Sequence, residues 1–91
     1  MLYMVIEQFK NGDPLPVAER FRHSGRMLPD GLSYVSSWVE TSGDRCFQLM
    51  ETSEPETLQR WIRRWDDLVE FEIVPVLAST EFWSQSRFHS T

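Results

Sequence analysis

The sequence predicts one α+β domain in which the elements follow the order strand, helix, strand, strand, helix, strand. The clearest observation is a change of hydrophobic period within residues 58–76. Apolar residues first recur at the spacing of a helix and then, beyond Asp66 and Asp67, at every second position as in a strand. Three further apolar stretches are separated by turn-forming Gly, Pro, Asn and Asp residues. The length of 91 residues suits a single domain.

Local patterns predict where each element lies. Strands are assigned where apolar residues alternate or run continuously, and helices where they recur at three- and four-residue spacing. The first helix has Val17 and Phe21 as its buried stripe and ends near Gly25, which can adopt a left-handed conformation. The expected elements are a strand over residues 1–9, a helix over about 14–24, strands over 32–40 and 45–52, a helix over about 53–66, and a strand over about 67–77.

This order is the split βαβ pattern of the ferredoxin-like fold. Right-handed crossovers place both helices on one face of a four-stranded antiparallel sheet with the strand order 4-1-3-2. Pro75 agrees with this arrangement, because proline in a sheet is largely confined to edge strands. We therefore expect a domain over residues 1–77. Residues 78–91 form a C-terminal tail whose aromatic residues predict that it docks on the domain or on a partner subunit.

Charge and cysteine content exclude several classes of protein. The net charge is −5 and no basic run exceeds the pair Arg63-Arg64, so we expect neither a nucleic acid nor a membrane as partner. No apolar segment approaches the roughly 18 residues that span a bilayer. Cys46 is the only cysteine, so no intramolecular disulfide can form and no second thiol completes a metal site. We expect a cytoplasmic protein without metal or cofactor.

Four segments together resemble a known family. They are MLYMVIEQF, LSYVSSWVE, RCFQLMET and RWDDLVEFEIVPV, and the resemblance covers roughly residues 1–77. The chain is similar to a small bacterial family of domains of unknown function in the dimeric α/β-barrel superfamily. The resemblance implies a ferredoxin-like subunit and a dimer. It implies no reaction, since the superfamily includes monooxygenases, haem-degrading enzymes, decarboxylases and ligand-sensing modules.

Assembly is also suggested by the predicted sheet itself. Two helices cover only one of its faces, whereas the first, third and fourth strands carry apolar side chains on both. Each large side chain left in water forgoes roughly 1.5 to 3 kcal/mol. We expect a homodimer in which two sheets pack face to face, with the aromatic tail as the alternative cover.

Three residues are candidates for an aromatic ligand pocket. Tyr34 and Trp38 are expected on the same face of the second strand, where they can line a pocket between sheet and helices. The alternative is that both belong to the core or to a dimer interface. His23, near the end of the first helix, can serve as a base or ligand at the pocket mouth, or only complement the helix dipole.

Acidic residues offer a second candidate site. We expect the first and third strands to run parallel as neighbours, which places Glu7 and Glu51 at the same edge of the sheet, where Glu70 and Glu72 also arrive. Such a cluster can hold a carboxyl of raised pKa for acid–base chemistry or bind a hard cation. The alternative is that these are solubilising charges at wet strand ends.

Two functions remain open from the sequence. The first is a dimeric protein that binds a small organic ligand and is a candidate cofactor-independent enzyme. Its ligand site would contain Tyr34, Trp38 and His23, with Glu51 or Glu7 at the rim. The second is a non-catalytic homodimer that serves assembly or regulation. No catalytic residue can be assigned.

Overall fold

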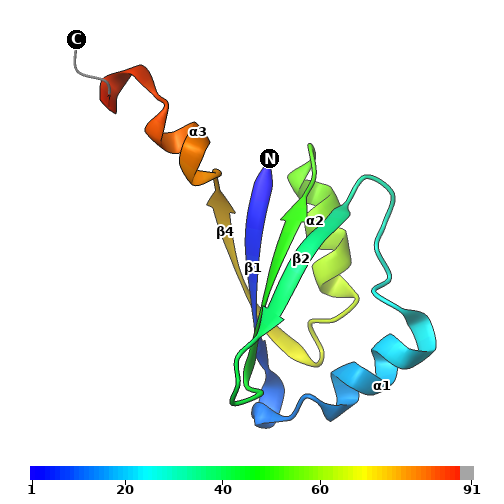
Figure 1. The fold of residues 1–91 in the computed structure, drawn as a ribbon. Coiled ribbons are helices and arrows are strands. Elements are labelled where there is room, and N and C mark those ends of the chain that lie inside the picture. Colours follow the sequence, from blue (N-terminus) through cyan, green and yellow to red (C-terminus); the bar gives the residue numbers. More distant parts are fainter. Residues whose placement is uncertain (89–91) are drawn as a thin grey trace.

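The computed structural model describes residues 1–88 and confirms the predicted α+β order (Figure 1). One antiparallel sheet has the strand order β2-β3-β1-β4, which is the predicted order read from the opposite edge. Its strands are β1 (Leu2–Phe9), β2 (Ser33–Val39), β3 (Arg45–Glu51) and β4 (Val69–Val76), and the helices are η1 (Lys10–Gly12), α1 (Leu15–Ser24), α2 (Pro55–Arg63), α3 (Ser79–Trp83) and η2 (Ser86–Phe88). β4 is an edge strand, as Pro75 predicted.

The prediction that the first and third strands run parallel is wrong. β1 and β3 pair antiparallel, with Leu2 opposite Glu51 and Glu7 opposite Cys46. The chain order requires this direction. The crossover through α1 makes β2 parallel to β1, and the hairpin after β2 then turns β3 back against both.

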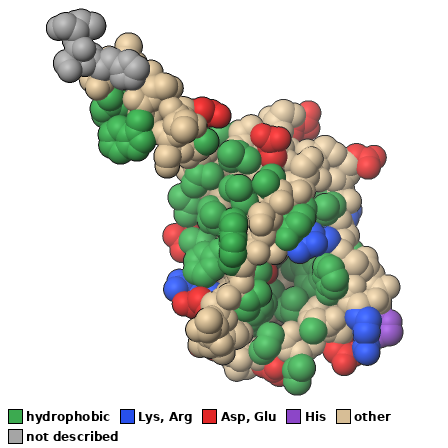
Figure 2. Space-filling view, in the orientation of Figure 1, with side chains coloured by type: hydrophobic (Ala, Val, Ile, Leu, Met, Phe, Trp, Pro, Cys, Tyr) green, Lys and Arg blue, Asp and Glu red, His purple; other side chains and the backbone are tan. Residues whose placement is uncertain are grey.

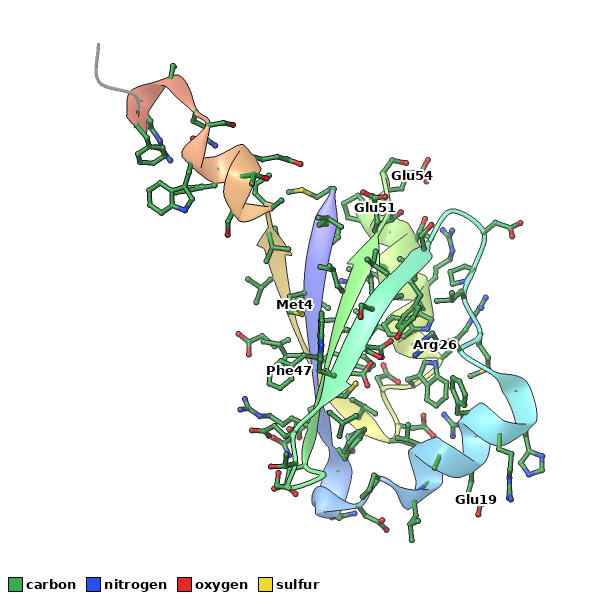
Figure 3. The ribbon with its side chains drawn as sticks, viewed as in Figure 1. Met4, Glu19, Arg26, Phe47, Glu51 and Glu54 are labelled. Carbon is green, nitrogen blue, oxygen red and sulfur yellow. The ribbon has the colours of Figure 1, made fainter. Side chains whose placement is uncertain are left out.

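The two faces of the sheet differ in character. On β1 the odd-numbered residues Tyr3, Val5, Glu7 and Phe9 are buried on the face that carries α2. Figure 3 shows Met4 and Phe47 on the other side of the sheet, away from α2. The open face is mainly apolar and largely half-buried in the single chain, with Arg45, Glu70 and Glu72 toward one end; by strand register its apolar residues are Leu2, Met4, Ile6, Trp38, Phe47, Leu49, Val74 and Val76.

The two helices also pack differently. α2 buries Thr57, Leu58, Trp61 and Ile62, which confirms its predicted apolar stripe. α1 has no fully buried residue: Val17 of its predicted stripe is half-buried against the core, whereas Phe21 is 46% exposed, so the predicted burial is wrong at Phe21. The physical reason is that α1 lies beside one end of the sheet and leaves a space above the strands (Figure 1).

The C-terminal tail continues from β4 and projects away from the sheet (Figure 1), which contributes to a longest dimension of 55 Å. Phe82, Trp83 and Phe88 pack on one another with ring centroids 4.9–5.0 Å apart. The docking of this tail stays a prediction, and residues 89–91 of the predicted tail lie outside the described residues. Every helix in residues 1–88 is too short or too polar to cross a bilayer.

Candidate functional site

A cavity of about 380 Å³ lies between the sheet and α1. Its walls are mainly apolar and include Phe9, Val17, Phe21, Trp61 and Trp65. Figure 2 shows the surface hollowed beside α1, with hydrophobic side chains around the hollow. The volume falls in the range of small-molecule sites, which are typically apolar clefts with a few placed polar groups.

Glu7 supplies a carboxyl group to the cavity from the C-terminal half of β1. Its side chain follows the alternation of the strand onto the α2 face, so the residue is only 5% exposed. Gln48 on β3 donates a hydrogen bond from Nε2 to Glu7 Oε2. Arg26, on the connection between α1 and β2, donates from Nε to Gln48 Oε1 at 3.1 Å. Three residues from three segments thus form one polar chain.

The chain of hydrogen bonds has a fixed direction. A guanidinium can only donate, so Gln48 must turn its carbonyl oxygen toward Arg26 and its amide nitrogen toward Glu7. Glu7 Oε2 is therefore always an acceptor. Because this bond is stronger to an unprotonated oxygen, a proton on this carboxyl favours Oε1, which has no protein hydrogen-bond partner among residues 1–88. Since no fully buried side-chain oxygen in that range lacks a partner, Oε1 is open to the cavity.

Burial raises the pKa of Glu7 to about 7, against an ordinary value of 4.5. The hydrogen bond from Gln48 and the charge of Arg26 lower the pKa but only partly offset the loss of solvation. Both protonation states are therefore populated near neutral pH. A carboxyl in this condition can accept or donate a proton at Oε1.

Arg26 is held in place through its backbone. The indole Nε1 groups of Trp61 and Trp65 both donate to its carbonyl oxygen, at 2.9 and 3.1 Å. Its guanidinium lies 3.7 Å from the ring centroid of Tyr34 and 5.3 Å from that of Phe21. Aromatic contacts of this kind orient the guanidinium plane. Arg26 is thereby attached to α2 and presented at the cavity (Figure 3).

Cys46 lies opposite Glu7 on β3 and also lines the cavity. Burial raises the pKa of its thiol to about 11, and the charge of Glu7 adds to the shift. The thiolate form is therefore scarce at neutral pH, which argues against Cys46 as a nucleophile.

Of the predicted site residues, Glu7 lies in the cavity and Tyr34 lies beside it. Tyr34 stacks on Arg26 and its hydroxyl is 2.7 Å from Ser37 Oγ. Trp38 is on the opposite face of the sheet, so the prediction that it shares a face with Tyr34 is wrong. A register shift at Val35 inserts one residue between them, and this reverses the alternation.

His23 and Glu51 lie elsewhere. His23 is exposed near the end of α1 and does not line the cavity. Glu51 is exposed at the far end of β3 (Figure 3), because β1 and β3 run antiparallel. Glu70 and Glu72 reach the end of the sheet near Glu7 but point to the open face, in register with Gln8 and Ile6. The predicted acidic cluster does not form.

No group of three His, Cys, Asp or Glu side chains in residues 1–88 has the arrangement of a metal site.

Two residues of the polar chain, Gln48 and Arg26, were not predicted from the sequence. One signal was available for Glu7, since it occupies the odd-numbered face of β1 between apolar Val5 and Phe9. A carboxyl in such a row is a candidate for burial. Arg26 gave no comparable signal, because its position depends on two distant indoles.

The four-stranded sheet and its two crossover helices define a ferredoxin-like α+β domain. The chain belongs to the family described as Domain of unknown function (DUF3303), whose family model matches residues 1–86. The match extends past the predicted boundary at residue 77 and includes α3. No curated protein and no solved structure matches the chain.

Proposed function

We propose that this protein binds a small organic molecule in the cavity beside α1, and that Glu7 exchanges a proton with it in a cofactor-independent reaction. The observation that carries the proposal is the carboxyl oxygen Oε1 of Glu7. It opens into a largely apolar cavity, while Oε2 is occupied by Gln48. A pKa of about 7 suits a general acid or base, because both protonation states are available at working pH.

The binding part of the proposal can be tested by filling the cavity. Ala18 lines it, and Leu15 on the same helix is 67% exposed and does not. We expect 2-naphthamide, a neutral flat probe, to bind the unmodified chain and Leu15→Trp in NMR titrations, and to lose at least about tenfold in affinity for Ala18→Trp. Equal binding to all three proteins would place the probe outside the cavity and contradict the proposal.

The proton-exchange part requires that Glu7 itself titrates near neutrality. The carboxyl carbon of Glu7, followed by NMR, should titrate with a midpoint close to the raised pKa of about 7. A bound probe should move this midpoint, because the probe lies against Oε1. A midpoint at the ordinary value of 4.5 would remove Glu7 as a proton carrier at physiological pH.

Native mass spectrometry of the purified protein would reveal a small molecule that stays bound to the protein during purification.

The open face of the sheet supports a second role, assembly into a homodimer. Trp38 is 55% exposed there, among seven half-buried apolar residues of β1, β3 and β4. A face of this kind on a small domain is typical of an interface. The aromatic tail, with Trp83 60% exposed, adds apolar surface that a partner subunit can cover.

Light scattering distinguishes a dimer from a monomer directly. We expect a dimer mass at micromolar concentration and a shift toward monomer in Trp38→Glu, since the substitution places a charge on the proposed interface. Leu15→Glu, on exposed α1, is the matched control and should leave the mass unchanged. A monomer mass for the unmodified chain would contradict the dimer and leave the cavity proposal standing.

A further inference from the structure

We infer that the ligand of the cavity is an organic carboxylate with a flat apolar body, and that its carboxylate group binds the guanidinium of Arg26. The inference rests on the proposed binding function of the cavity and adds the chemical class of the ligand. It begins from the hydrogen bonds that Arg26 makes and those that it leaves unmade.

Among residues 1–88, Arg26 uses one of its five donor hydrogens in a hydrogen bond to the protein. Nε donates to Gln48, whereas Nη1 and Nη2 have no acceptor among residues 1–88. Arg20 and Arg45 behave differently, because each forms paired hydrogen bonds with one carboxylate, that of Asp67 or Glu40. The Nη groups of Arg26 remain available for a ligand at the cavity wall. Two parallel N–H···O bonds to a carboxylate are the interaction that this group makes best.

Glu7 is not the missing partner of Arg26. Gln48 stands between the two side chains and bonds to both, so no direct ion pair forms. Tyr34 and Phe21 contact the guanidinium through their rings and offer it no carboxylate. Among residues 1–88 the guanidinium therefore has no directly bonded carboxylate, and Glu7 acts on it only across Gln48.

The walls define the rest of the ligand. Phe9, Phe21, Trp61 and Trp65 present rings to the same cavity that Arg26 borders. Rings favour a flat apolar body, which can stack on or meet their edges. A molecule with such a body and one carboxylate can satisfy the walls and Arg26 together. Oε1 of Glu7 remains for a second polar group of the ligand.

Binding of an anion should be coupled to the protonation of Glu7. The titratable groups that face Glu7 are Cys46 from β3 and Arg26 from the connection. α1 and α2 present apolar side chains to it, and Phe71 of β4 lies opposite it. A bound carboxylate favours the neutral form of Glu7, so binding takes up a proton. Affinity should therefore fall as the pH rises from about 6 to about 8.

The test compares two probes of nearly the same shape, 2-naphthoate and 2-naphthamide, by NMR titration of the full chain. We expect the carboxylate to bind at least about tenfold more tightly than the amide at pH near 6. This advantage should shrink by pH near 8. In Arg26→Met the ratio of the two affinities should fall to about one. Arg22→Met removes an exposed arginine of α1 that does not line the cavity, and it should keep the ratio.

The outcomes separate this inference from the proposed function. If both probes bind the cavity equally, or the amide binds more tightly, the carboxylate class is wrong while the binding function stands. If neither probe binds, the binding function fails and the inference fails with it. Should Arg26→Met unfold, as circular dichroism would reveal, the probe comparison and its pH trend in the unmodified chain still decide the question.

Discussion

α1 and α2 occupy equivalent places in the βαββαβ order, yet they do different things. α2 buries four residues on the sheet, and Trp61 is 1% exposed. α1 buries none and is joined to the α2–β4 turn by Arg20, which donates to both carboxylate oxygens of Asp67 at 2.7 Å. The comparison teaches that one helix completes the core and the other covers a cavity.

The largest expected effect tests the core side of this comparison. Trp61→Ala should lower the free energy of unfolding by about 3–5 kcal/mol, because a fully buried ring and its bond to the Arg26 carbonyl are lost. Phe21→Ala on α1 removes a ring that is 46% exposed, and should cost less than about 1 kcal/mol. Urea denaturation measures both. Similar losses would mean that α1 also belongs to the core.

An intermediate effect concerns the buried carboxyl of Glu7 on β1. Above about pH 4.5 the Glu7 side chain of the unfolded chain loses its proton, whereas the folded chain keeps it until the pH approaches 7. As the pH rises from about 4.5 to about 7, the free energy of unfolding should therefore fall by about 3 kcal/mol, and above that range it should stay constant. Glu7→Gln should remove this slope in urea denaturation at a series of pH values. Glu51→Gln, at an exposed site, should retain it.

The smallest effect on stability tests how α1 is held. Arg20→Met removes the pair with Asp67 and a bond to the Arg64 carbonyl at 3.0 Å. Exposed pairs contribute little to global stability, so the unfolding midpoint should move only slightly. Amide hydrogen exchange should accelerate in α1 and stay unchanged in α2. Arg22→Met, which breaks a pair within α1, is the control. Faster exchange in both helices would show that they open together.

Hydrophobic period was enough to predict the fold, because each element has a pattern of its own. The stripe of α2 and the edge position of Pro75 could both be read from sequence. The candidate site could be predicted only at Glu7 and, in part, at Tyr34. Trp38 was misplaced because one extra residue at Val35 reverses the faces of β2, and no pattern in the sequence marks it.

The predicted order of strands and helices already required β1 and β3 to pair antiparallel. The prediction that Glu51 lies at the same edge of the sheet as Glu7 was therefore inconsistent with that topology. Gln48 and Arg26 are a different case. Gln48 becomes part of the site only through a neighbouring strand and a distant guanidinium. Such contacts join residues that are far apart in the sequence, so no local spacing pattern predicts them.

The two indole bonds to the Arg26 carbonyl have a consequence for how the protein can diversify. They attach the Arg26 backbone to Trp61 of α2 and to Trp65, and Gln48 and Glu7 lie on the sheet, so the polar chain contacts α1 only at the ring of Phe21. Substitutions at other cavity-lining positions of α1, such as Val17 and Ala18, can then change the shape of the cavity without removing a contact of Arg26, Gln48 or Glu7. Ligand selectivity is in this way assigned to α1, and proton exchange to Glu7 on the sheet. A protein designer could therefore change the cavity walls on α1 and retain Glu7 with its hydrogen bonds.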